Sequence, residues 1–287
     1  MAVAELANAQ PVPFDPDEAA ADHQQLFGFN LFPYESVFRH PSGLLGGPVT
    51  EAVAQTYRQY PFSPPAAAAP DHIGVQLAFL AFLCAASASG AETDSPQAQT
   101  AQRHFLQTRL LPWLPPLVVS LRRQPLPFYQ AVGDLLLELA ADHACALGIE
   151  TAPGDDGVAA PPPPLLADDK TSLRDIARFL LTPSYSGLWL SREDISCLAR
   201  QRDLPRGFGE REQMLLNVLR AAAQYDALVL FLTDLHRYRE GWQAAYQELT
   251  VHYPTLASFI APWQARCDNA GTLLSQIATH PACRTGC

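Results

Sequence analysis

The chain has 287 residues, is 48% hydrophobic and 17% charged, and carries a formal net charge of −10 at pH 7. This length leaves room for two domains, and the apolar fraction suffices for a sizeable core. The acidic balance argues against nucleic acid or an anionic membrane as a partner, because either one requires a basic face on the protein. It suits a partner that carries arginines.

The start of the chain and its hydropathy predict where the protein resides. Residues 1–18 contain acids and prolines instead of the basic start and apolar core of a secretory signal peptide. Proline or charge interrupts every apolar stretch before it reaches the length of a membrane span. We therefore expect a cytoplasmic protein without a membrane span.

Six cysteines are scattered along the chain without a Cys-x-x-Cys pair. Three of them are expected as small buried residues in a reducing compartment: Cys84, Cys145 and Cys197. The other three, with His280 nearby, are either zinc ligands or tail thiols: Cys267, Cys283 and Cys287. Because their spacing matches no standard zinc motif, no metal and no other cofactor is expected.

The composition predicts four regions. Residues 1–16 are expected as a flexible N-terminal arm and residues 17–148 as a helical domain. Residues 149–164 end in four consecutive prolines, which form no helix and bury little surface, so a stiff linker is expected. Residues 165–287 are expected as a helical C-terminal extension.

Within these regions the apolar residues recur at helical spacing. Helices are predicted over residues 17–38 with a break at Pro33, 49–60, 70–84, 97–111, 117–123, 128–147, 173–181, 191–202, 210–233, 235–252 and 255–277. No stretch shows the sustained alternation of a strand, so we expect an all-α, multi-helix bundle.

The stretch over residues 70–84 is the most informative. Pro70 cannot continue a helix backwards, and Asp71 is a good N-cap for the helix that follows. His72 comes next, at the positive end of the helix dipole. Because adjacent residues at a helix start do not face each other, the pair is not expected to form a catalytic dyad. Contact of both residues with the same bound segment is geometrically easier than a catalytic dyad.

Two further features concern apolar side chains. Trp113 lies among prolines and is either an anchor in the core or the floor of a groove. The predicted helix over 128–147 has one apolar face, formed by Tyr129, Val132, Leu135, Leu136 and Leu139.

Motifs for catalysis are missing from the sequence. It contains no Gly-x-Ser-x-Gly, no His-Glu-x-x-His and no glycine-rich phosphate loop after a strand. An enzyme that uses Asp71 and His72 as acid and base stays an alternative, but it lacks a third catalytic group. We therefore do not expect an enzyme.

Several of these stretches resemble a known family. Residues 70–80 (Pro-Asp-His-Ile-Gly-Val-Gln-Leu-Ala-Phe-Leu) resemble the signature of the TorD-type chaperones, the redox enzyme maturation proteins. Residues 105–115, which include Trp113, resemble their second sequence block. The Phe-Tyr pair at 128–129 resembles the piece that follows that block.

Residues 34–38 and 43–47 resemble the branch that serves type II members of the dimethyl sulfoxide reductase family. The matching blocks cover residues 20–147 in the family's order. Three residues depart from its usual pattern: Ala68 and Gln76 replace glutamates, and Arg109 replaces a histidine.

The resemblance implies a chaperone that binds another protein and catalyses nothing. Its partner is the apo catalytic subunit of an exported molybdoenzyme of the dimethyl sulfoxide reductase family, or that subunit's twin-arginine leader. The chaperone holds this partner for cofactor insertion and assembly before export. A homodimer is compatible with this function. The alternative is an accessory protein that binds the molybdenum cofactor or a nucleotide.

The resemblance also implies a peptide-binding site. It is formed by Tyr34, Asp71, His72, Gln76, Arg109, Trp113 and Pro115. We expect Tyr34 and Trp113 to line an apolar groove for the leader. Asp71 is expected to attract the leader's arginines, and His72 is expected to add a hydrogen bond that depends on pH.

Overall fold

The computed structural model describes residues 2–10, 13–88, 95–152, 162–166 and 171–279. Helices and loops make up these residues, apart from one isolated β-bridge, so the all-α prediction is confirmed. The first half contains α1 (Ala2–Ala9), α2 (Pro16–His23), η1 (Gln24–Asn30), α3 (Glu35–Arg39), α4 (Pro48–Tyr57), α5 (Ile73–Ala88), α6 (Ser95–Phe105), η2 (Leu106–Leu110), α7 (Leu114–Arg122) and α8 (Pro127–Ala146). The second half contains α9 (Leu173–Leu181), α10 (Pro183–Ser186), α11 (Arg192–Arg200), α12 (Arg211–Gln224), α13 (Leu228–His252), η3 (Pro254–Leu256) and α14 (Ala257–Thr279).

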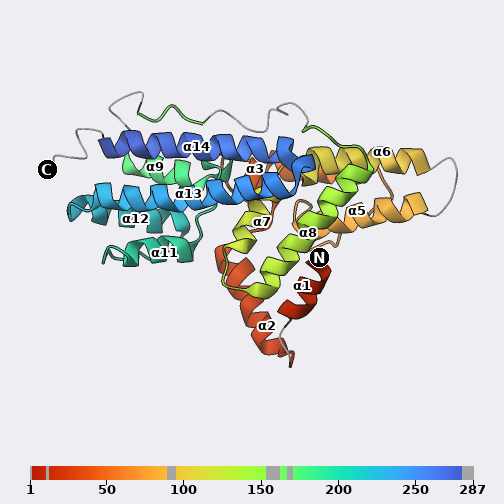
Figure 1. The fold of residues 1–287 in the computed structure, drawn as a ribbon, viewed down its shortest axis with the longest axis horizontal. Helices are drawn as coiled ribbons and strands as arrows, with labels where there is room; N and C mark the ends of the chain where they lie inside the picture. Colours follow the sequence, from red (N-terminus) through yellow and green to blue (C-terminus); the bar gives the residue numbers. More distant parts are fainter. Residues whose placement is uncertain (1, 11–12, 89–94, 153–161, 167–170, 280–287) are drawn as a thin grey trace.

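Two long antiparallel helices, α13 and α14, run side by side along the molecule (Figure 1). Helices α9, α11 and α12 lie at one end of this pair, and α5 and α6 lie at the other. Helix α8 crosses between them, with α1 beside it and α2 near its start. Two short segments, η1 and η2, are π-helical.

Buried tryptophans tie the two halves together. The indole Nε1 of Trp189 donates to the carbonyl of Asn30 at 2.7 Å, and its ring lies 5.5 Å from that of Phe38. The indole of Trp263 donates to the carbonyl of Pro112 at 2.8 Å. Residues on both sides of the proline-rich segment therefore contribute to one hydrophobic core. The division into an N-terminal domain and a C-terminal extension stays a prediction.

Three predicted segments differ from the observed elements. The segment expected as a flexible arm contains helix α1. The helix expected over 17–38 consists of α2, η1 and α3, with extended residues between η1 and α3. The helix expected over 210–233 is broken, because Asp226 adopts a φ of +54° and the amide of Ala227 turns back to the carbonyl of Ala222.

The cysteines occupy different environments. Cys267 is buried in α14 and Cys84 is half-buried, whereas Cys145 and Cys197 are exposed on the outer sides of their helices, contrary to expectation. Cys283, Cys287 and His280 lie outside the described residues. Within the described part of the chain, no group of three or more metal-binding side chains comes together.

None of the described helices is both long enough and apolar enough to cross a membrane.

Gly187 allows a test of how α10 docks on α14. It has a φ of +72°, and a Cβ at this position meets the backbone nitrogen of Cys267 and the carbonyl oxygen of Trp263 at 2.6 Å. Because both obstacles are backbone atoms, we expect Gly187→Ala to lower the free energy of unfolding by about 2–5 kcal/mol. Gly46→Ala is the control, since Gly46 has a φ of +88° and no neighbour within 4 Å.

In the control Gly46→Ala, the free energy of unfolding should fall only by the cost of holding alanine in a left-handed backbone conformation, about 1–2 kcal/mol. Urea denaturation followed by circular dichroism measures both values. Equal losses in the two variants contradict the tight docking of α10 on α14.

Candidate functional site

A short antiparallel pairing brings the two sequence motifs together. Pro33 disfavours helix in the residue before it, so residues 31–34 are extended. The carbonyl of Pro33 accepts the amide of Ile73 at 3.0 Å, and Glu35 donates its amide to the carbonyl of Asp71 at the same distance. Tyr34 and His72 form the bridge between these segments.

Asp71 caps a helix other than the one predicted. It is fully buried, and its Oδ2 accepts the amide of Ser36 at 3.0 Å. With its carbonyl already bound to the amide of Glu35, Asp71 satisfies the first two amides of α3. The predicted N-cap role of Asp71 for α5 is therefore wrong. The ring of His72 takes that role, because its Nδ1 accepts the amide of Gly74 at 3.1 Å.

A buried carboxylate lies at the centre of the site. The Oε1 of Glu35 accepts from Nη1 of Arg39 at 2.6 Å and lies 3.8 Å from Nη1 of Arg109. Its Oε2 accepts from the amide nitrogen of Gln76 at 2.6 Å. The Oε1 of Gln76 in turn accepts from the indole of Trp113 at 3.2 Å. We call these residues the Glu35 network: Glu35, Arg39, Gln76, Arg109 and Trp113.

Burial dominates the electrostatics of this network. Burial raises the pKa of Glu35 from its ordinary value of 4.5 to about 7, against the opposing effect of Arg39 and Arg109. Burial also lowers the pKa of His72, although the nearby Asp71 opposes this shift. A neutral imidazole agrees with the accepting role of Nδ1 in the cap of α5.

The seven predicted site residues divide into an inner and an outer group. Four are buried: Asp71, Gln76, Trp113 and Pro115. Trp113 is fully buried with its ring 5.7 Å from that of Phe38, so it is an anchor in the core. Tyr34 and His72 are half-buried, and the side chain of Arg109 is 19% exposed. The structure therefore brings Tyr34 and His72 to the surface directly above the Glu35 network.

Aromatic side chains continue this surface. The rings of Tyr34 and His72 are 4.9 Å apart, those of His23 and Phe27 are 5.1 Å apart, and those of Phe27 and Tyr129 are 5.3 Å apart. His23 is also close enough to His72 to add to the lowering of its pKa, after the larger effect of burial. We call this set the aromatic band: His23, Phe27, Tyr34, His72 and Tyr129. Each member is half-buried or exposed.

Sequence reasoning missed two kinds of residue here. Glu35 and Arg39 were not assigned to the site, although a charged residue within the apolar run 34–38 indicates a buried ion pair. His23 and Phe27 were not assigned either. Their partners lie far away in the sequence, so no local pattern could have identified them.

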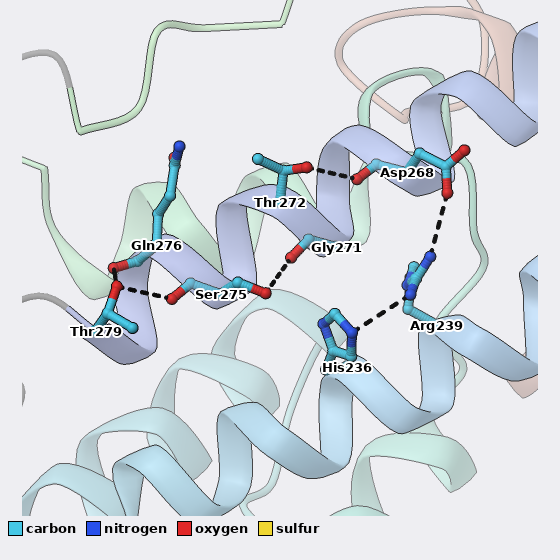
Figure 2. A pocket seen from close by; sticks show the side chains of 8 residues that line it. All are labelled: His236, Arg239, Asp268, Gly271, Thr272, Ser275, Gln276 and Thr279. Atoms are coloured by element: carbon cyan, nitrogen blue, oxygen red, sulfur yellow. Dashed lines mark hydrogen bonds and ion pairs between the residues drawn. The ribbon is translucent and has the colours of Figure 1, made fainter.

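A separate pocket of about 520 Å³ lies between α13 and α14 (Figure 2). Arg239 is buried in its wall and donates to Asp268 at 3.4 Å. Gly271 leaves room for Arg239, because any Cβ at position 271 would lie only 3.0 Å from the guanidinium. The opposite wall carries Ser275 and Thr279. None of the predicted site residues lines this pocket, which combines one cation, one anion and neutral polar groups.

The raised pKa of Glu35 predicts how stability depends on pH. Between pH values of about 4.5 and 7 the folded chain binds more protons at Glu35 than the unfolded chain. The free energy of unfolding therefore falls as pH rises through this range. Above a pH of about 7, the titration of Glu35 changes the free energy of unfolding no further. Glu35→Gln cannot titrate and should lose this decrease, on the order of 3 kcal/mol.

Urea denaturation of both proteins at intervals from pH 4.5 to 8 measures the difference. Glu193→Gln is the matched control, because the Glu193 side chain is 64% exposed and bonds only to Arg200 within the described residues. The control should keep the wild-type profile. A wild-type profile in Glu35→Gln contradicts the raised pKa.

Comparison with known proteins matches the region that contains the site. Residues 1–119 match the family described as the nitrate reductase delta subunit. No curated protein and no solved structure gives a significant match. The matched residues include the whole Glu35 network and all of the aromatic band except Tyr129. Members of this family are maturation chaperones for molybdoenzymes. Over residues 1–119 the chain is therefore similar to the nitrate reductase delta family, and this similarity supports a redox enzyme maturation protein of the TorD type.

Proposed function

We propose that this protein is a cytoplasmic chaperone for the catalytic subunit of an exported molybdoenzyme of the dimethyl sulfoxide reductase family. It binds the apo subunit, its twin-arginine leader, or both, and holds them for cofactor insertion and assembly before export. It acts by binding alone. The aromatic band is the observation that carries this proposal.

The band has the properties of a peptide-binding surface. Its rings are partly exposed, and they come from α2, η1, α8 and the paired segments around Tyr34 and His72. Aromatic grooves bind extended or helical peptides through apolar contact, with few obligatory polar bonds. The Glu35 network beneath the band holds Tyr34 and His72 in position. This arrangement supports recognition of the apolar part of a leader.

Acidic side chains lie next to the band. Asp22 is close enough to Tyr129 to raise the pKa of its phenol, after the larger effect of burial. Asp17 and Glu18 are exposed in the first turn of the same helix, α2. Arginines bind carboxylates through charge-assisted hydrogen bonds. Because Asp71 is fully buried, we assign the attraction of the leader's arginines to α2 instead.

Calorimetric titration with a synthetic twin-arginine leader from the host's molybdoenzyme tests the proposal. We expect Tyr34→Ser and Tyr129→Ser each to weaken binding at least tenfold, about 1.4 kcal/mol. The expected loss reflects the missing aromatic contact. Phe208→Ser is the matched control, since Phe208 is 92% exposed in the loop before α12 and lies outside the band. It should bind like the wild type.

A second titration separates the two parts of the partner. It uses the apo catalytic subunit with its leader removed. Binding of the leader alone assigns the band to the leader, and binding of the leaderless subunit alone assigns it to the enzyme core. Unchanged affinity for both ligands in both tyrosine variants contradicts the band as the binding surface.

A further inference from the structure

Helix α1 (Ala2–Ala9) is held only lightly. Among residues 3–9, Leu6 and Ala9 are half-buried and the others are exposed. Val3, for example, is 67% exposed. Eight residues are fewer than an isolated helix needs to be stable in water. The helix therefore depends on its contact with α8, in which only Leu6 and Ala9 are partly buried.

Three faces of α8 can be distinguished by their neighbours. Gly133 and Leu137 belong to the face that packs on α7 and the core, where a Cβ on Gly133 meets Leu121 at 3.2 Å. A second face is acidic and carries Asp134, Glu138 and Asp142, all of which act electrostatically on Tyr253 between α13 and η3. Helix α1 also contacts α8, and because the first two faces have other neighbours we assign it to the third face.

This third face is apolar. Phe128, Val132, Leu135 and Leu139 follow one another at intervals of four, three and four residues, which places them on one side of α8. Phe128 is 37% exposed and Leu139 is 57% exposed. Val132 and Leu135 are half-buried but lie outside the set of apolar side chains that pack against the core. We call these four residues the α8 stripe.

The stripe is continuous with the aromatic band. The rings of Phe128 and Tyr129 are 5.3 Å apart, so the stripe begins where the band ends. Asp22 of α2 lies beside Tyr129 at this junction. A ligand that follows both surfaces meets acidic groups near the junction and a purely apolar face along α8. This pattern complements a peptide with a basic beginning and an apolar helical continuation.

We propose that α1 is a displaceable cover over the α8 stripe, and that the apolar helical segment of a twin-arginine leader replaces it. This inference rests on the proposed function, because it takes the leader as the ligand. Helix α1, which contacts α8, is a short, alanine-rich helix with a single acidic residue, Glu5, and is therefore the kind of segment that an apolar face accepts. A longer apolar helix gains more contact than α1 makes, so exchange is favourable. In the absence of a partner α1 covers the middle of the stripe, where Val132 and Leu135 are half-buried, and leaves Phe128 and Leu139 at its ends exposed.

Two substitutions in α1 test the cover directly. Leu6→Asp places a charge at a half-buried position of α1, whereas Val3→Asp places the same charge at an exposed position near the start of the same helix. We expect Leu6→Asp to increase the fluorescence of the neutral dye Nile red several-fold and Val3→Asp to leave it unchanged. Val3→Asp should keep the wild-type circular dichroism spectrum, and Leu6→Asp should lose no more than the helical signal of the eight residues of α1. Equal dye fluorescence in the two variants contradicts the proposal that α1 covers the α8 stripe.

The leader titration tests the occupant. We expect Leu6→Asp to bind the twin-arginine leader about tenfold more tightly than Val3→Asp, a difference of about 1.4 kcal/mol. Adding Leu139→Ser to Leu6→Asp should remove this gain. Leader binding with equal affinity in both α1 variants overturns the cover but leaves the proposed function intact. Absence of leader binding in the wild type and in Leu6→Asp overturns the occupant together with the leader-binding function.

Discussion

The burial of Glu35 is the constraint on which the site depends. A buried carboxylate without partners is strongly destabilising, so the chain must place cations and donors around it. Arg39 lies one turn later on the same helix, but Gln76 and Arg109 come from α5 and η2. Satisfying one carboxylate therefore fixes three segments relative to one another. Trp113 is then held by the remaining oxygen of the Gln76 amide.

This constraint also determines what faces outward. Tyr34 directly precedes Glu35, and His72 directly follows Asp71. In the extended pairing around the bridge, neighbouring side chains point in opposite directions, so the two acids lie inside and the two rings lie at the surface. The charged groups build the scaffold, and the aromatic groups remain for contact. Glu35 is already engaged with Arg39 and Gln76, and Asp71 with the first amides of α3, so the proposed contact with another chain falls to the rings.

Two of the three departures from the family pattern, Gln76 and Arg109, have a physical explanation in the network. A glutamate at position 76 places a second carboxyl group where the Gln76 amide nitrogen lies, 2.6 Å from Glu35. Two carboxylates at this distance cannot both ionise, because their charges repel. Gln76 avoids this conflict by donating to Glu35 and accepting from Trp113 at the same time. Arg109 adds a guanidinium whose Nη1 lies 3.8 Å from Oε1 of Glu35.

The sequence by itself determined the helical class, because helical periodicity and the absence of alternation are local properties. It also identified Asp71, His72 and Trp113 as members of one region. Only the tertiary structure decided that Asp71 caps α3, that Trp113 is an anchor, and that His23 and Phe27 lie near Tyr129. These facts depend on which distant segments pair, and pairing follows from burial of the whole chain. No local pattern contains that information.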